Sequence, residues 1–144
     1  MDVPEHPSIR ALGFVTDDEK FDLIAASELL IMPSFFESLS MVALEAWALG
    51  RPVLANARCD VLVGQCLRSN GGLYYANGDE FEAALDLLLS DGRLASRLGE
   101  NGRRFYTRHY GWDVIERKYL DMFDELNRAP RSGAMPPPPG WWER

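Results

Sequence analysis

The sequence predicts an α/β domain built on a doubly wound parallel sheet. Residues 29–32, 53–55 and 73–75 are short apolar runs, and strands that are apolar on both faces are typical of a parallel sheet covered by helices on each side. Segments with helical periodicity separate these runs, an alternation that favours the doubly wound arrangement. Residues 9–15 form a similar run that ends in a turn, so we expect four strands.

Two helices are predicted in the first third of the chain. Thr16 and Glu19 have the spacing of a capping box, which starts a helix with Phe21 and Ile24 on one side. The run that ends at Pro33 is followed by an alanine-rich segment, and we expect its helix to begin near Ser40. A strand that passes into a helix in this way leaves unpaired backbone N–H groups at the helix start.

Three further helices follow the last apolar run. Residues 79–82 have the spacing of a second capping box, and apolar residues at helical spacing follow them. Residues 94–105 predict another helix, irregular around Gly99 and Gly102, because glycine is a poor helix former. Apolar residues between 112 and 126 then mark a last amphipathic helix.

Composition limits the function classes. The 144 residues suffice for one domain with a real core. A net charge of −7 argues against a general nucleic-acid surface, which needs clustered basic residues. No apolar stretch approaches the roughly 18 residues of a membrane span, and no signal segment is visible, so we expect a cytoplasmic chain without a transmembrane segment. Cys59 and Cys66 are expected to be reduced, partly buried thiols rather than metal ligands.

Glu37 and Glu45 flank the predicted helix start near Ser40. The positive end of the helix dipole and the free amides attract phosphate. Both carboxylates can border the same crevice, on either side of one anion site. A nucleoside diphosphate sugar suits this layout, because its ribose and hexose carry hydroxyl donors on either side of a pyrophosphate. Two solvated surface glutamates would explain the same spacing.

The flanking residues carry a resemblance to a known family. They are Leu12 to Val15, Thr16 to Lys20, Pro33 and Ser34, Glu37 to Glu45, Ala46, Gly50 to Val53, and Gly72 with Leu73. Together, over roughly residues 8–127, they resemble the C-terminal half of the retaining family-four glycosyltransferases (glycosyl transferases group 1). These are two-domain enzymes of the GT-B type, so the resemblance implies a Rossmann-like nucleotide-sugar donor-binding domain that is incomplete here.

The resemblance also implies roles for individual residues. Glu37 would contact the donor sugar as the catalytic residue, without acting as a nucleophile, and Glu45 would bind the ribose hydroxyls. The amides near Ser38, Leu39, Ser40 and Met41 would face the diphosphate, and Phe14 with Val15 would offer backbone groups to the nucleobase. For these last two, a plain strand-to-helix turn is an equal alternative. No metal and no cofactor is expected, with the nucleotide sugar as substrate.

The chain departs from the family pattern in one place. The family has Gly-aromatic-Gly where this chain has Ser38, Leu39 and Ser40, and glycine allows a positive φ at little cost. Two other loops lie next to predicted strands. Arg58, after the third predicted strand, either pairs with a phosphate or is a solvated arginine. Residues 68–72 precede the fourth predicted strand and are expected to form a turn at the opposite edge of the sheet.

The domain organisation follows from the extent of the resemblance. We expect an N-terminal arm over residues 1–7, the partial donor-binding domain over 8–128, and a Pro-rich, disordered tail over 129–144. The first strand-helix units of the donor domain and the acceptor-binding N-terminal domain have no counterpart, so the chain is expected to need a separate or missing N-terminal part for sugar transfer to an acceptor. The alternative is a non-catalytic nucleotide-sugar-binding or interaction module.

Overall fold

The computed structural model describes residues 5–128, which divide into two units. The first unit ends at Gly111, and the second begins at Trp112. The elements of the first unit are α1 (Asp17–Ala26), β1 (Leu30–Met32), α2 (Met41–Ala48), β2 (Val53–Asn56), α3 (Asp60–Ser69), β3 (Gly72–Tyr75), α4 (Gly78–Ser90) and α5 (Gly92–His109). In the second unit the described residues form α6 (Trp112–Arg128).

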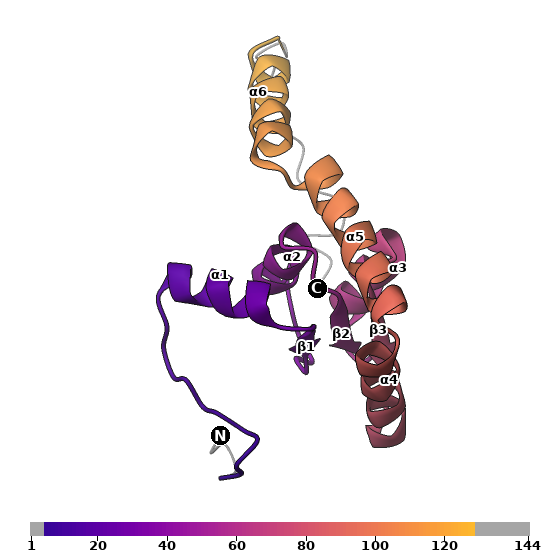
Figure 1. The fold of residues 1–144 in the computed structure, drawn as a ribbon. Coiled ribbons are helices and arrows are strands. Elements are labelled where there is room, and N and C mark those ends of the chain that lie inside the picture. The colour runs from indigo at the N-terminus through magenta and orange to yellow at the C-terminus, as the bar shows by residue number, and fades with distance from the viewer. Residues whose placement is uncertain (1–4, 129–144) are drawn as a thin grey trace, which may run out of the picture. The chain divides into compact units, whose positions relative to one another are not determined.

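A parallel sheet lies at the centre of the first unit (Figure 1). Within the described residues it has three strands in the order β1-β2-β3. The register pairs Leu30 with Val53, and Val53 in turn with Gly72. The three predicted apolar runs are therefore strands, and their C-terminal ends lie at one edge of the sheet, where ligands of open α/β sheets bind.

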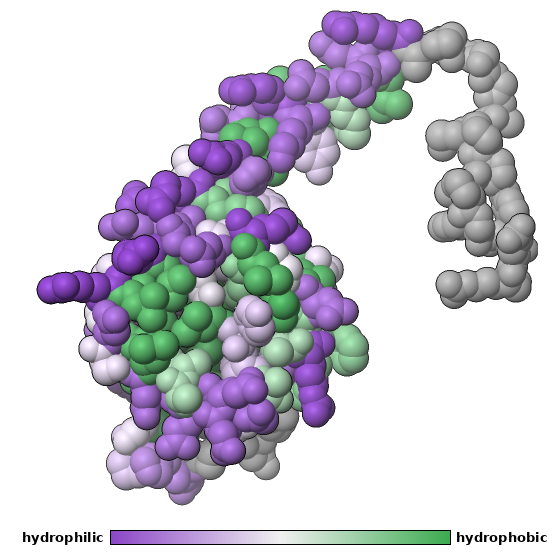
Figure 2. Space-filling view, turned by 90° about the vertical axis from the view of Figure 1, so that its right-hand side faces the viewer, coloured by the Kyte–Doolittle hydropathy of each residue, from purple (hydrophilic) through white to green (hydrophobic). Residues whose placement is uncertain are grey.

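Helices cover both faces of this sheet, as a doubly wound fold requires. Val53 and Ala55 pack into one core with residues of α2 and α3, whereas Leu54 packs on the other face with residues of α4 and the start of α5. Every residue of β2 is buried. The predicted α/β, doubly wound class is thereby confirmed. Hydrophobic residues also gather on an outer face of this unit (Figure 2).

Two glycines let α5 pack closely on its neighbours. A Cβ on Gly102 would lie 2.0 Å from Cδ1 of Trp47, and a Cβ on Gly99 would lie 2.0 Å from the Gly50 carbonyl oxygen. We predicted an irregular helix at these positions, which is wrong, because α5 is one continuous helix of 18 residues. The glycines serve close approach, and packing outweighs their low helix propensity.

The expected strand over residues 9–15 is absent from the described structure. No strand pairs with this segment, and Ile9 and Phe14 leave 48% and 104% of their surface exposed. A strand requires a neighbour for its backbone groups, and β1, at the edge of the sheet, pairs only with β2 in residues 5–128. The prediction of a strand from apolar content alone was wrong for that reason.

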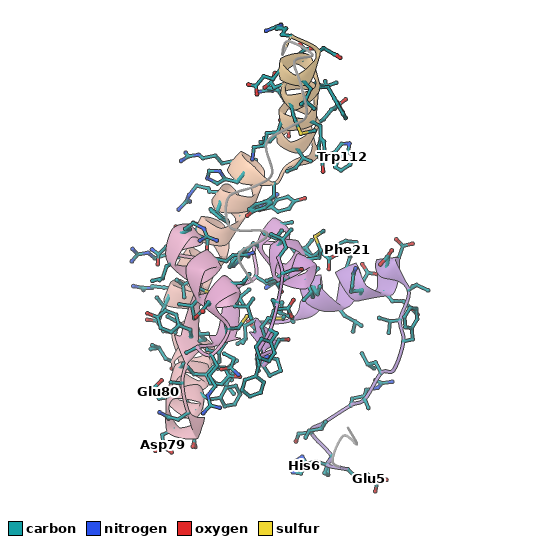
Figure 3. All side chains as sticks on the ribbon, turned by 180° about the vertical axis from the view of Figure 1, so that it is seen from behind. Glu5, His6, Phe21, Asp79, Glu80 and Trp112 are labelled. Carbon is teal, nitrogen blue, oxygen red and sulfur yellow. The ribbon has the colours of Figure 1, made fainter. Side chains whose placement is uncertain are left out.

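The helix caps agree with the sequence at α1 and differ at α4. Thr16 and Glu19 form the predicted capping box. At α4 the cap is Asn77, whose side chain accepts a hydrogen bond from the Glu80 amide, and the Glu80 carboxylate accepts one from the Ala76 amide. The capping box predicted at residues 79–82 was therefore misplaced by two residues, and Asp79 lies within the first turn (Figure 3).

Cys59 and Cys66 are both free and buried in the core shared by α2 and α3. Burial raises the pKa of the Cys66 thiol to about 11, because the thiolate loses its hydration. The prediction of reduced thiols is confirmed, although both are more deeply buried than expected. A thiol with this pKa is not reactive at neutral pH.

The second unit is represented by α6, which confirms the last predicted helix. Its apolar residues, including Tyr119, Phe123 and Leu126, follow helical spacing, and none of its described residues is buried. In residues 5–128 no helix is long and apolar enough to cross a membrane. The predicted tail over residues 129–144 and the first four residues of the predicted arm lie outside the described residues. The interval 8–128 as one domain stays a prediction.

The contact between Gly102 and Trp47 predicts a sharp effect of one added methyl group. Gly102→Ala should lower the free energy of unfolding by about 1–3 kcal/mol, because the new Cβ overlaps a fully buried indole ring. The matched control is Gly92→Ala in the same helix, where a Cβ meets nothing within 4 Å. Urea denaturation followed by circular dichroism checks this, and equal stability of the two variants would contradict it.

Candidate functional site

The candidate site is the loop of residues 33–40, which leaves the C-terminal end of β1 and enters α2. The α2 helix begins at Met41, and its first backbone hydrogen bond is donated by Ala43 to the Ser40 carbonyl, at 3.2 Å. The amides of Met41 and Val42 precede that bond and so lack a helical acceptor. The start of α2 therefore presents free N–H groups and the positive end of a dipole.

Two buried amide side chains hold this loop in place. Asn56, at the end of β2, donates from Nδ2 to the Pro33 carbonyl at 3.0 Å. Gln65, in α3, donates from Nε2 to the Leu39 carbonyl and is 1% exposed. The loop is thus fixed at both ends by neighbouring elements. Neither residue was predicted, because a buried amide in a strand or helix gives no local signal of its partner.

Ser40 adopts a left-handed backbone conformation, which glycine reaches at little cost. Its φ of 57° and ψ of 77° lie in the left-handed region, which costs a residue with a Cβ roughly 1–2 kcal/mol. Its side chain is 5% exposed, and its Oγ has no hydrogen-bond partner in the described chain. A strained residue with an unpaired buried hydroxyl at a helix start is a candidate ligand contact.

The two glutamates differ in their surroundings. Glu37 is half-buried in the loop and forms no hydrogen bond or ion pair with residues 5–128. Glu45, in the second turn of α2, accepts a hydrogen bond at Oε1 from Lys20 Nζ at 3.0 Å. No described group binds its second oxygen, Oε2, which leaves one acceptor for a ligand hydroxyl.

Lys20 binds a carboxylate of the candidate site, a contact that the sequence did not predict. It lies in α1, and its Nζ is 4.8 Å from the centre of the Phe21 ring. Its hydrogen bond with Glu45, followed by that with Asp17, raises the pKa of the Lys20 amine. The lysine is 25 residues from Glu45 in sequence, so only the packing of α1 beside α2 brings the pair together.

The remaining predicted donor residues fall into two groups. Ser38 and Met41 are exposed, whereas the Leu39 side chain packs against the core. Phe14 and Val15 line a separate surface hollow along α1. Their proposed contact with a nucleobase therefore stays a prediction.

Arg58 lies next to the candidate loop. Its guanidinium is 5.8 Å from the centre of the Phe35 ring, and its backbone N–H donates to Asn56 Oδ1 at 3.0 Å. The ring contact places a positive charge beside the segment that carries Glu37. The Arg58 side chain is exposed, as expected for a solvated loop arginine, and its pairing with a phosphate stays a prediction.

Comparisons with known proteins point in one direction. The family model described as glycosyl transferases group 1 matches residues 6–105. The chain is 32% identical over 117 residues to an MMP alpha-(1->4)-mannosyltransferase of Mycolicibacterium hassiacum, covering 77% of this chain and 28% of that protein. It is 33% identical over 118 residues to a D-inositol 3-phosphate glycosyltransferase of Streptomyces bingchenggensis, covering 81% and 26%.

Two solved structures are also similar to this chain. Sucrose-phosphate synthase from Thermosynechococcus elongatus superposes with a TM-score of 0.66 at 27% identity, covering 73% of this chain and 27% of that one. WaaG, a glycosyltransferase involved in lipopolysaccharide biosynthesis, gives 0.60 at 27% identity, covering 74% and 29%. The chain thus spans under a third of the length of each of these four proteins.

The strain at Ser40 predicts that glycine is better tolerated there. Ser40→Gly should raise the free energy of unfolding by about 1 kcal/mol, because it relieves the left-handed strain and removes an unpaired buried hydroxyl. The matched control is Asn70→Gly, since Asn70 also has a positive φ, of 46°, but asparagine tolerates it. Thermal melts of both variants check this, and a Ser40→Gly melting temperature at or below that of the unsubstituted protein would refute it.

Proposed function

The chain belongs to the glycosyl transferases group 1 family, as its sequence indicated, and we propose that it is the donor-binding half of a retaining glycosyltransferase. In this proposal the start of α2 binds the diphosphate of a nucleotide sugar, and the enzyme transfers the sugar to an acceptor with retention. In the same proposal, a separate N-terminal part of the enzyme binds the acceptor. The cytoplasmic location stays a prediction.

The observation that carries the proposal is the backbone at Ser40. Its left-handed conformation brings an unpaired Oγ next to the amides of Met41 and Val42, and these donors have no acceptor among residues 5–128. A diphosphate supplies acceptors and negative charge, and both suit a helix N-terminus. Because Asn56 and Gln65 fix the loop, these donors are held in place before the ligand arrives, which is the condition for electrostatic preorganisation.

The two glutamates have separate roles in this proposal. Glu37, which lacks a partner within the described chain, accepts a hydrogen bond from a hydroxyl of the donor sugar and favours positive charge at the anomeric carbon. Glu45 accepts a hydrogen bond from a ribose hydroxyl at Oε2, while Lys20 continues to donate to Oε1. Glu45 is the more constrained of the two side chains, because Lys20 binds it whereas Glu37 has no ion pair within residues 5–128.

The chemistry follows from charge. The bond between the anomeric carbon and the diphosphate oxygen breaks with its electron pair on the diphosphate, and positive charge develops on the sugar as in glycoside hydrolysis. The acceptor hydroxyl oxygen forms the new bond on the same face, and its proton passes to the departing diphosphate. The amides at the start of α2 stabilise the leaving group. We propose that no metal or cofactor takes part.

The magnitudes predict weak binding by this chain alone. A charged hydrogen bond from Glu45 contributes about 1.5–3 kcal/mol, and the helix end contributes about 0.3–2 kcal/mol. Millimolar affinity requires about 4 kcal/mol. We therefore expect nucleotide affinity near the millimolar range and no sugar transfer without the remaining part of the enzyme.

The role of Glu45 is tested by calorimetry with UDP and GDP. Glu45→Ala should weaken binding of the preferred nucleotide about tenfold or more, because the ribose loses a charged acceptor. Lys20→Ala is the matched control: it breaks the same part-buried ion pair but keeps the carboxylate, so it should change the nucleotide affinity less than Glu45→Ala does. Binding that survives Glu45→Ala unchanged would exclude the assigned role.

The role of Glu37 separates an enzyme from a binding module. In the chain reconstituted with the N-terminal part of the enzyme, Glu37→Gln should abolish most sugar transfer and leave nucleotide affinity nearly unchanged, because the amide keeps the shape of the side chain and removes its charge. The measurement is sugar transfer from a radiolabelled donor. Unchanged transfer in the variant would support a function that does not use this carboxylate.

A further inference from the structure

A second polar hollow lies where the end of α3 meets the second half of α5. Its volume is about 230 Å³. We call it the arginine pocket, and it is lined by Arg68, Asn70, Asn101, Arg104, Arg108 and His109. None of these residues takes part in the proposed donor site.

The pocket is held together by contacts between its two elements. Asn101 Nδ2 donates to the Asn70 carbonyl at 2.9 Å, which ties α5 to the end of α3. Asn101 Oδ1 in turn accepts a hydrogen bond from the Arg104 guanidinium. Arg104 and Arg108 are four residues apart, so they lie on one face of α5. Residues distant in sequence thus form one wall.

The charge of this wall is largely unbalanced. The chain carries a net charge of −7, yet α5 contains five arginines and one glutamate. That glutamate, Glu100, reaches Arg104 only at 3.9 Å, between two exposed side chains, and such a pair contributes little. Arg68 and Arg108 form no ion pair with any carboxylate of residues 5–128.

Three guanidinium groups around one small hollow match the chemistry of a phosphate. Arginine offers planar, paired donors that fit phosphate oxygens, and the Asn70 and Asn101 amides border the same space. The hollow is smaller than the roughly 300–1,000 Å³ of pockets that enclose a whole drug-sized ligand. We propose that the arginine pocket binds a single phosphate group, either free or carried by a larger molecule that remains outside.

This pocket is separate from the donor site. Asn70 precedes β3, whereas the loop of residues 33–40 follows β1. Because the strands are parallel, the beginning of one and the end of another lie at opposite edges of the sheet. Phosphate binding in the arginine pocket therefore does not depend on the proposed glycosyltransferase function.

The first test is a titration of the full chain with inorganic phosphate, followed by amide NMR shifts at constant ionic strength. Shifts are expected around Asn70 and Asn101, with a dissociation constant on the order of 1 mM. Arg104→Gln with Arg108→Gln should weaken binding about tenfold or more. The matched control, Arg93→Gln with Arg97→Gln, removes the same charge from exposed positions of the same helix outside the pocket and should leave binding nearly unchanged.

The second test identifies the source of the phosphate. The same proteins are sedimented with phosphatidylcholine vesicles containing phosphatidic acid, which exposes a phosphomonoester. Binding to vesicles that requires Arg104 and Arg108 assigns the pocket to a lipid headgroup, and phosphate binding without vesicle binding assigns it to a free ligand. Equal losses in both double variants, or neither phosphate shifts near Asn70 nor vesicle binding, would overturn the proposal.

Discussion

The packing of Trp47 against α5 determines where the candidate site lies. The indole is fully buried, donates from Nε1 to the Gly71 carbonyl at 2.8 Å, and meets the Phe105 ring edge-on at 5.9 Å. Because Gly102 has no side chain, α5 lies directly against this ring. Trp47 is near the end of α2, so fixing it also fixes the direction in which the start of α2 points.

The start of α2 contains the strained backbone of the candidate site. Ser40 has a left-handed conformation and an unpaired buried hydroxyl, and both cost stability. The Trp47 contact and the Asn56 and Gln65 hydrogen bonds stabilise the surrounding structure enough to hold it. A rigid framework of this kind holds backbone donors in fixed positions, as a preorganised anion site requires.

The sequence predicted those features that depend on neighbouring residues. The three apolar strands, the Thr16 capping box and the helix start near Ser40 all have local signals. The failures depend on partners far along the chain. Residues 9–15 lack a strand to pair with, and Gly99 and Gly102 are explained only by Gly50 and Trp47.

The sequence also predicted the loop and helix start that carry the candidate site, but not the tertiary contacts of that segment. The spacing of Glu37 and Glu45 and the family resemblance predict these two residues as ligand contacts. In the structure, Lys20 donates a hydrogen bond to one carboxylate oxygen of Glu45. Periodicity could not reveal this pair, because α1 and α2 are joined by a strand and two loops. The carboxylate identified from the motif is thus already bound by a neighbouring lysine, and no group among residues 5–128 binds its second oxygen.

The net charge of the whole chain, taken alone, would argue against both proposed anion sites. A chain with a charge of −7 repels phosphate at long range, yet the field of exposed charges is screened over about 8–10 Å at physiological ionic strength. Within that distance, the start of α2 and the arginines of α5 are locally positive. The composition therefore excludes an extended nucleic-acid surface while permitting small, built phosphate sites at the two edges of one sheet.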